Sequence, residues 1–231
     1  MSKKIGIIGA MPSEVETLIA QMENDRPVTV ASCIFHEGKL GGQDVVAVRG
    51  GCGKVAAALC AQIMILRFGV DLLINTGTAG TLSDKLSIGD IAVSENVVEW
   101  DMDTSAVGDP VGYLSGPNII YVPADKALTQ AVTETLDALN EKYVVGTICS
   151  GDTFVANSDL KRRIAENFNG IACEMEGAAV GHVCYVNKVP FVVIRAVSDG
   201  GNEAVQMDYP TFVKIAAAKS AEMVIALLKR L

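Results

Sequence analysis

The chain has 231 residues, about half of them apolar, and a formal net charge of -8 at pH 7. This composition supplies a sizeable hydrophobic core, and an acidic chain without a Lys/Arg cluster excludes a nucleic-acid or phospholipid surface, since both need a basic footprint. No apolar run reaches the roughly 18 residues of a membrane helix, so we expect a soluble protein whose partner is a small molecule.

Cysteine and histidine are arranged in ways that argue against redox or metal chemistry. The six cysteines include no CxxC pair, which favours reduced, buried thiols in a cytosolic protein. Only His36 and His182 supply imidazoles, so a His-based metal site or a Ser-His-Asp triad has few available members. We therefore expect no metal and no other cofactor.

The amino-terminal half alternates short apolar runs with helical patterns. Residues 4–10 predict a first buried strand, and Pro12 begins a helix that is expected to continue to about Asn24. The pattern then predicts a hairpin of two strands, at 28–35 and 44–49, across a turn at 38–42. A helix is predicted at 53–68, and two more buried strands follow at 71–78 and 90–97.

A loop rich in Gly, Pro and acidic residues over 99–117 separates the two halves of the chain. Beyond it the alternation resumes, with helices expected at 124–142, 159–168, 175–187 and 209–231 and strands at 144–150, 170–173 and 189–199. The last of these strands, VPFVVIRAVSD, has the composition of a strand buried in a parallel sheet. Alternation without a linker favours one α/β domain over residues 1–231.

The segment GCGKVA at residues 51–56 fits the G-x-G-x-x-A pattern of dinucleotide sites. Asp71 would be the ribose-binding acid, yet it stands at the start of the next strand, where the motif requires the end. Val55 follows Gly53-Lys54 where a P-loop needs Ser or Thr to hold magnesium. We interpret the glycines as a tight strand-to-helix turn, which can still line a ligand pocket.

Carboxylates follow three predicted strands of the sheet. Glu14 follows the first strand, Glu174 and Glu176 flank the start of a helix, and Asp199 ends the strand at 189–199. One acid near a helix start can serve only to stabilise that helix. Since ligands bind outside the carboxyl ends of parallel strands, the convergence of three such ends predicts a site.

These acids suit the cleavage of a glycosidic bond. Such a reaction needs an acid for the leaving group, a base for water and anchors on the sugar hydroxyls. Asp199 acting as an acid near neutral pH requires a pKa raised by burial, which the apolar strand before it can supply. The segment SGDTFV at 150–155 has two readings, a grip on a flat aromatic base or an ordinary turn with Phe154 in the core.

Several segments together resemble one known family. They are IGIIGAMPSEV, GGCGKVAAA, INTGTAG, GDIAVSE, SGDTFV, CEMEGAAVGHVC and VPFVVIRAVSD, in chain order over nearly the whole chain. They are similar to the bacterial 5'-methylthioadenosine/S-adenosylhomocysteine nucleosidases, within the nucleoside phosphorylase superfamily. The resemblance implies a three-layer α/β/α domain with a mixed, barrel-like central sheet. It also implies hydrolysis of the N-glycosidic bond of both substrates, and of 5'-deoxyadenosine, in methionine salvage and methyl-cycle recycling.

The resemblance also implies a role for each carboxylate. Glu14 would polarise the attacking water, with Arg195 and Thr78 helping to place it. Glu176 would hold the ribose hydroxyls, and Asp199 would protonate the adenine N7. The remaining matched positions would contact substrate: Ser198 beside Asp199, Phe154 and Val155 at the base, and Met175, Ala10, Met11, Cys52 and Tyr209 around the ribose and the 5'-alkylthio group.

The resemblance further implies a homodimer in which a loop of one subunit closes the pocket of the other, here near Val107. That loop and Cys52 carry smaller side chains than is usual at these positions, which leaves open the preference among 5'-substituted adenosines, aminodeoxyfutalosine included. Two other functions are alternatives for the same residues, a phosphate-dependent purine nucleoside phosphorylase and a non-catalytic nucleoside sensor. Glu14 argues against both, because a carboxylate repels phosphate and binding alone needs no group to activate water.

Overall fold

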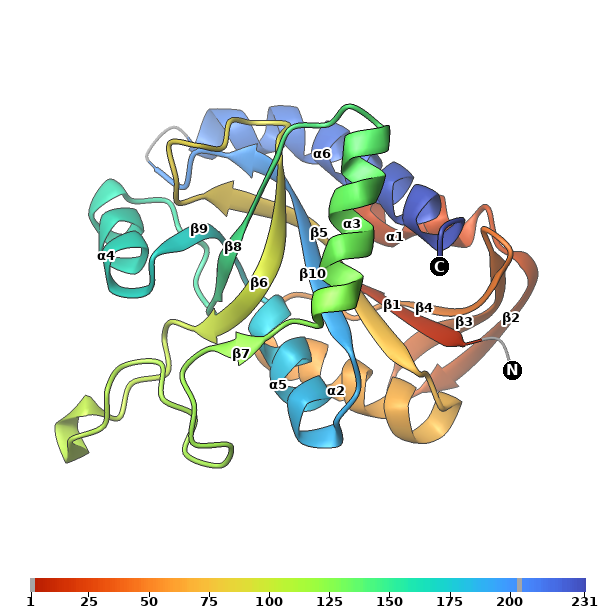
Figure 1. Cartoon of the computed structure of the whole chain (residues 1–231), viewed down its shortest axis with the longest axis horizontal. Helices are drawn as coiled ribbons and strands as arrows, with labels where there is room; N and C mark the ends of the chain where they lie inside the picture. Colours follow the sequence, from red (N-terminus) through yellow and green to blue (C-terminus); the bar gives the residue numbers. More distant parts are fainter. Residues whose placement is uncertain (1–2, 203–204) are drawn as a thin grey trace.

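The computed structural model describes residues 3–202 and 205–231 of the chain. Within these residues all strands join one sheet, with helices on both faces (Figure 1). The strands are β1 (Lys4–Gly9), β2 (Glu23–Val30), β3 (Cys33–Leu40), β4 (Gln43–Arg49), β5 (Leu72–Thr81), β6 (Ile91–Glu99), β7 (Val122–Pro123), β8 (Tyr143–Ser150), β9 (Gly170–Glu174) and β10 (Phe191–Asp199). The helices are α1 (Pro12–Ile19), α2 (Lys54–Ile63), α3 (Lys126–Ala138), α4 (Ser158–Phe168), α5 (Gly177–Asn187) and α6 (Val205–Leu228).

Five of the strands close on themselves as a small barrel. β10 pairs with both β5 and β6, and β9 pairs with both β8 and β5, so the order β5-β10-β6-β8-β9 returns to β5. The pairs β5–β10, β6–β8 and β8–β9 are parallel, whereas β6–β10 and β5–β9 are antiparallel. β1 and β4 extend the sheet from β5, followed by β3 and β2. The predicted three-layer α/β/α fold with a mixed, barrel-like sheet is confirmed.

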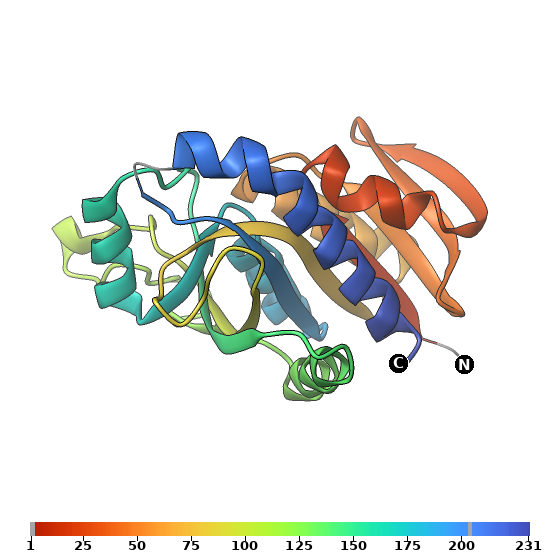
Figure 2. The same cartoon turned by 90° about the horizontal axis from the view of Figure 1, so that it is seen from above.

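Separate cores lie on the two faces of the sheet. α1, α3 and α6 cover one face with Leu18, Val132 and Val224, all fully buried, and α6 runs across the top of the sheet (Figure 2). α2 and α5 pack against each other on the other face. The described residues include no helix with the length and apolar character needed to cross a membrane. All six cysteines are free thiols.

Two predicted boundaries in the first fifty residues are wrong. The stretch expected as one strand at 28–35 is two strands, β2 and β3, because the chain reverses at Ala31 and Ser32, both with positive φ. Neither alanine nor serine is typical of a turn with positive φ, so the sequence does not predict it. The first helix ends at Ile19, and Glu23 already pairs with β3, so strand pairing overrides the helical propensity of residues 20–24.

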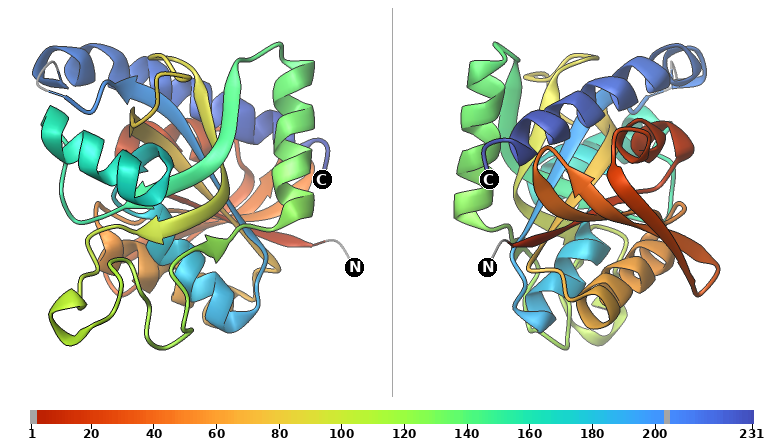
Figure 3. Two further views of the ribbon diagram at one scale, coloured as in Figure 1. Left: turned by 60° about the vertical axis from the view of Figure 1, so that its left-hand side comes forward. Right: turned by 90° about the vertical axis from the view of Figure 1, so that its right-hand side faces the viewer.

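The predicted loop at 99–117 projects from the body on the same side of the sheet as α2 and α5 (Figures 1 and 3). It has one short helical turn, at Ser105–Val107, and Leu114 forms an isolated bridge with Ile119. The two-residue strand β7 follows, which the sequence did not predict because Val122–Pro123 is too short to show a period. Val107 at the loop tip is 82% exposed.

Candidate functional site

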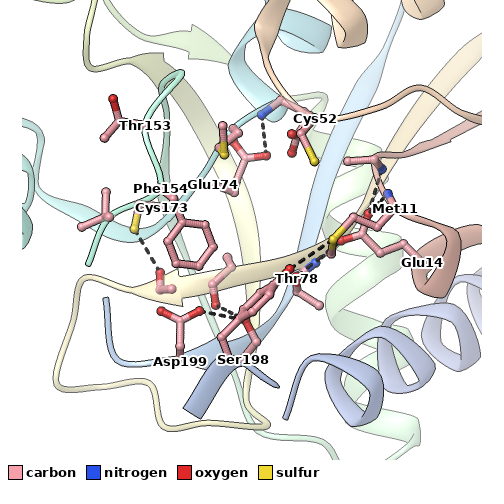
Figure 4. A pocket seen from close by; sticks show the side chains of 17 residues that line it. Met11, Glu14, Cys52, Thr78, Thr153, Phe154, Cys173, Glu174, Ser198 and Asp199 are labelled. Atoms are coloured by element: carbon pink, nitrogen blue, oxygen red, sulfur yellow. Dashed lines mark hydrogen bonds between the residues drawn. The ribbon is translucent and has the colours of Figure 1, made fainter. Parts of the chain in front are cut away.

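A cavity of about 550 Å³, including its open mouth, lies where β1, β5, β9 and β10 meet (Figure 4). Its lining comes from the ends of these strands, the segment after β8, the turn before α2 and the side of α6. The lining residues are Ala10, Met11, Glu14, Cys52, Thr78, Ala79, Gly80, Thr153, Phe154, Val155, Cys173, Glu174, Met175, Glu176, Ser198, Asp199 and Tyr209.

Glu14 is fixed at both carboxylate oxygens. It lies in the first turn of α1, directly after the sharp exit from β1, and is 2% exposed. Its Oε2 accepts hydrogen bonds from the Ala10 and Met11 amides at 2.7 and 2.9 Å. Its Oε1 accepts from the Thr78 amide of β5 at 3.0 Å. These donors hold the carboxylate at the cavity wall, with one edge directed at the neighbouring strand.

Glu176 reaches the cavity from the start of α5. Its Oε1 accepts a hydrogen bond at 2.9 Å from the amide of Gly53, whose φ of 96° sets the turn before α2. The pKa of Glu176 is raised to about 7, because burial and the Glu174 carboxylate, which raise it, outweigh the Arg195 guanidinium, which lowers it. The GCGKVA turn therefore serves to bind a cavity carboxylate and to place Cys52 in the lining, which agrees with its interpretation as a tight turn.

Behind Glu176 lies a buried ionic cluster. Arg195 on β10 is 1% exposed, and its Nη2 donates to Glu174, to Glu176 at 3.4 Å and to Asn75 at 2.5 Å. Glu174 also accepts from the Ser150 hydroxyl and from the Gly177 amide. Since a buried charge is tolerated only when it is paired, the two glutamates and the arginine form one unit.

Asp199 is the last residue of β10 and is 2% exposed. Its Oδ1 accepts from the Gly201 amide and its Oδ2 from the Ser198 hydroxyl, both at 2.9 Å. Burial raises the pKa of Asp199, and these two hydrogen bonds lower it. The raised pKa favours a protonated carboxyl group that points into the cavity (Figure 4).

An aromatic and sulfur-rich wall faces the carboxylates. The rings of Phe154 and Tyr209 meet edge to face with centroids 5.1 Å apart. The Tyr209 hydroxyl lies 3.1 Å from the Met11 sulfur, and Cys52 and Met175 add two more sulfur atoms to the lining. Phe154 is 48% exposed, so the reading that places it in the core is wrong. This wall suits a flat, apolar ligand.

No three His, Cys, Asp or Glu side chains are grouped to hold a metal ion anywhere in residues 3–202 or 205–231. The cavity instead brings three acids to the wall of an apolar slot. Asp199 has a raised pKa, the Glu14 carboxylate is fixed by backbone amides, and Glu176 is the third. Such a set can protonate a leaving group, orient a water molecule and bind hydroxyls.

Comparison with known proteins identifies the family. The family model described as "Phosphorylase superfamily" matches residues 4–229. The 5'-methylthioadenosine/S-adenosylhomocysteine nucleosidase of Shewanella halifaxensis is 42% identical over 230 residues, which cover 99% of this chain and 100% of that protein. The chain belongs to the 5'-methylthioadenosine/S-adenosylhomocysteine nucleosidase family.

Solved structures of family members have the same fold. The nucleosidase of Neisseria meningitidis in complex with methylthio-immucillin-A superimposes with a TM-score of 0.96 at 35% identity, covering 99% of this chain and 100% of that one. The nucleosidase of Colwellia psychrerythraea 34H in complex with adenine gives a TM-score of 0.95 at 39% identity, covering 100% of this chain and 96% of that one. The resemblance seen in the sequence is thereby confirmed.

The cavity brings together most residues that the resemblance to this nucleosidase family implies. Two of them do not line it: Arg195 lies behind Glu176, and Val107 lies at the tip of the projecting loop. The lining also includes residues that were not predicted as contacts, Ala79, Gly80, Thr153, Cys173 and Glu174. Glu174 belongs to the segment CEMEGAAVGHVC, and the charge of Arg195 in an apolar strand could have indicated it, because a buried arginine needs an acidic partner.

The expectation that all the cavity acids follow strands of one parallel set is wrong for β9, which is parallel to β8 but not to β5. This strand is antiparallel to β5, pairing Cys173 with Gly80. Its carboxyl end therefore runs back toward the middle of β5, where Thr78 contacts Glu14. Barrel closure, which a pattern of buried strands does not reveal, brings Glu176 to the site.

Proposed function

We propose that this protein hydrolyses the N-glycosidic bond of 5'-methylthioadenosine and S-adenosylhomocysteine and releases adenine. The observation that carries this is the cavity itself, in which Asp199, Glu14 and Glu176 face one slot lined by Phe154. Family members bind adenine and methylthio-immucillin-A, according to the names of their structures. Ligands of that kind fit a slot with one aromatic wall.

Asp199 acts as the acid in this proposal. It donates its proton to N7 of adenine, so that the electron pair of the breaking glycosidic bond is accepted by a protonated purine, which leaves as neutral adenine. The Ser198 hydroxyl and the Gly201 amide, each 2.9 Å from a carboxylate oxygen, stabilise the negative charge that then develops on Asp199. Burial, which raises the pKa of Asp199, favours the protonated form that this step requires.

Glu14 polarises the attacking water, and Glu176 binds the ribose hydroxyls. Thr78 on β5 helps to place the water through Glu14, whose Oε1 accepts a hydrogen bond from the Thr78 amide. Arg195 positions Glu176 through the buried cluster with Glu174, without lining the cavity. Positive charge spreads over the ribose in the oxocarbenium-like transition state, so three nearby acids stabilise it better than they stabilise the ground state.

Water is favoured over phosphate as the nucleophile. None of the described residues that line the cavity is Lys or Arg, and Glu14 occupies the wall next to the proposed attack point. A phosphate dianion requires fixed cationic donors there. The 5' end is lined by Cys52, Met11 and Met175; burial and the Glu176 and Glu14 carboxylates raise the pKa of the Cys52 thiol, which stays neutral and suits an alkylthio group.

The proposal includes a cytoplasmic homodimer of single-domain chains, each spanning residues 1–231, that acts in methionine salvage. Exposed apolar side chains support the dimer: Val55 and Leu59 on α2 and Tyr185 and Val186 on α5. These helices pack side by side, and the loop with Val107 projects from the same side of the sheet (Figures 1 and 3). The loop can then close the cavity of a second subunit.

The test is adenine release by the purified protein from a panel of 5'-substituted adenosines, with and without phosphate. We expect release without phosphate, and we expect Asp199→Asn and Glu14→Gln each to lose at least about 100-fold in kcat, the usual contribution of an acid or base. Adenine release that depends on phosphate and yields a ribose 1-phosphate product would assign the protein to the phosphorylases. Unchanged turnover in Asp199→Asn would remove Asp199 from the mechanism.

A further inference from the structure

Lys161 lies outside the cavity lining, in the first turns of α4, yet it is joined to Asp199 through one peptide group. Its Nζ donates a hydrogen bond at 2.9 Å to the carbonyl of Gly200. The amide of Gly201 belongs to the same peptide unit, and it donates at 2.9 Å to Asp199 Oδ1. The two hydrogen bonds therefore act on opposite ends of a single planar unit.

We propose that Lys161 is a positioning residue for proton transfer from Asp199, because it holds the Gly200 carbonyl and thereby directs the Gly201 amide at the carboxyl group. This inference rests on the proposed role of Asp199 as the acid. In a planar trans peptide the C=O and N–H bonds point in opposite directions, so an anchor on the oxygen fixes the direction of the hydrogen. Hydrogen bonds in such a chain also polarise one another.

The peptide needs an anchor because both of its residues are glycines. Gly201 has a φ of 61°, and neither residue has a side chain that restricts rotation of the shared peptide plane. After rotation a carbonyl oxygen would face Asp199 in place of the amide. That oxygen would accept the acid proton and would repel the carboxylate that forms when the proton moves to the purine.

The anchor acts chiefly in the transition state. Ground-state binding uses the carboxyl proton, which the Gly201 amide does not contact, whereas the amide stabilises the charge that appears during the reaction. Loss of the anchor is therefore expected to lower kcat and to leave KM nearly unchanged. A residue that merely supported the shape of the pocket would raise KM instead.

Charge gives a second, separate readout. Burial raises the pKa of Asp199, as does Asp208 on α6, while the Lys161 ammonium on α4 lowers it. The other groups that face Asp199 are neutral near pH 7, because burial raises the pKa of the Cys173 thiol on β9 and raises that of Tyr209 on α6 to about 12. Removal of the Lys161 ammonium removes a group that lowers the pKa of Asp199, so the carboxyl group should stay protonated to higher pH.

The experiment compares three variants of the full chain in steady-state assays with 5'-methylthioadenosine. Lys161→Met keeps the length of the side chain and removes its charged donor, and we expect kcat at the pH optimum to fall about tenfold with KM within about twofold. The alkaline limb of the kcat/KM profile should move to higher pH. Lys161→Arg keeps a charged donor and should restore most of kcat. Arg162→Met is the matched control, because Arg162 pairs with Asp159 on the exposed face of the same helix.

Two results would overturn the positioning role. One is a Lys161→Met variant with the kcat and the alkaline limb of the unmodified protein. The other is a variant whose loss of kcat comes with a raised KM and a melting temperature lowered by more than about 5 °C, which is the signature of a scaffold residue. Failure of the proposed function would be distinct, since it would appear as full turnover in Asp199→Asn whatever the result at Lys161.

Discussion

At the scale of single residues, Glu176 lies between opposing charges, and their sum decides its ionisation. It is 4% exposed, and the Arg195 guanidinium lowers its pKa whereas the Glu174 and Glu14 carboxylates raise it. Burial and the two acids outweigh the guanidinium, and the pKa rises to about 7 from an ordinary 4.5. Ionised Glu176 therefore lowers the free energy of unfolding, although it is the residue suited to bind the ribose hydroxyls.

The sign of this cost predicts a pH dependence of folding. Because the folded pKa of Glu176 is raised, its contribution to stability is complete below about pH 4.5 and is lost as the pH rises through about 7. Glu176→Gln removes the loss, so at pH 8 the variant should be more stable than the unmodified protein by up to about 3 kcal/mol, whereas at pH 4.5 the two should be similar.

Urea unfolding at several pH values measures this difference. Glu166→Gln on the exposed face of α4 is the control and should leave the pH dependence unchanged. Equal stability of Glu176→Gln and the unmodified protein at pH 8 would mean that Arg195 compensates the Glu176 charge in full. Catalysis should respond in the opposite direction, with loss of kcat, because the ribose contacts need the carboxylate.

At the scale of elements, three strands of the barrel meet at Gly80. This residue of β5 pairs with Cys173 of β9 and with Asp199 of β10. A Cβ atom at position 80 would lie 2.8 Å from Asp199 Oδ1 and 3.4 Å from the Cys173 sulfur. The absence of a side chain here is what allows the end of β10 to bring its carboxyl group against β5.

Gly80→Ala should therefore displace the acid. We expect kcat for adenine release to fall at least about tenfold and the free energy of unfolding to fall by about 1–3 kcal/mol, as in other overpacked cores. The control is Gly116→Ala in the projecting loop, where a Cβ atom meets nothing within 4 Å. Retention of full turnover by Gly80→Ala would show that Asp199 can shift without loss of function.

Local patterns predicted the elements well where a period was long enough to read. The buried strands and the helices after β1, β8 and β9 were predicted from apolar runs and helical periodicity, and Pro12 marked the start of the first helix. The turn at Ala31 and Ser32 and the direction of β9 were missed, because both are decided by partners distant in the sequence. The same limit applied to Arg195. Its position in the sequence placed it near the end of β10, but it did not show that Glu174 and Glu176 are its partners.

At the scale of the whole molecule, the cavity and the loop with Val107 belong to different parts of the surface. Val107 does not line the cavity of its own chain and is 82% exposed. The homodimer proposed above supplies a contact for this exposed side chain. In a two-fold dimer each loop would close the cavity of the other subunit, so each site would contain residues of both chains.

This arrangement predicts complementation between two inactive variants. Asp199→Asn has a defective cavity and an intact loop, whereas Val107→Glu has an intact cavity and a defective loop. In a mixed dimer the cavity of the Val107→Glu subunit is closed by the loop of its Asp199→Asn partner and should be active. Equal mixing with random reassociation gives about half mixed dimers, each with one competent site, hence about a quarter of the activity of the unmodified protein.

Adenine release after joint refolding, set against the summed rates of the separate variants, measures the gain. A mixture of Asp199→Asn with Glu14→Gln is the control and should show none, because both residues line the cavity of one chain. An additive rate for the Asp199→Asn and Val107→Glu pair would mean that each cavity is complete within its own chain. A gain in activity in the Asp199→Asn and Val107→Glu mixture but not in the control mixture requires that the loop of one subunit acts at the cavity of the other. Only then do the two defects lie in different sites of the mixed dimer.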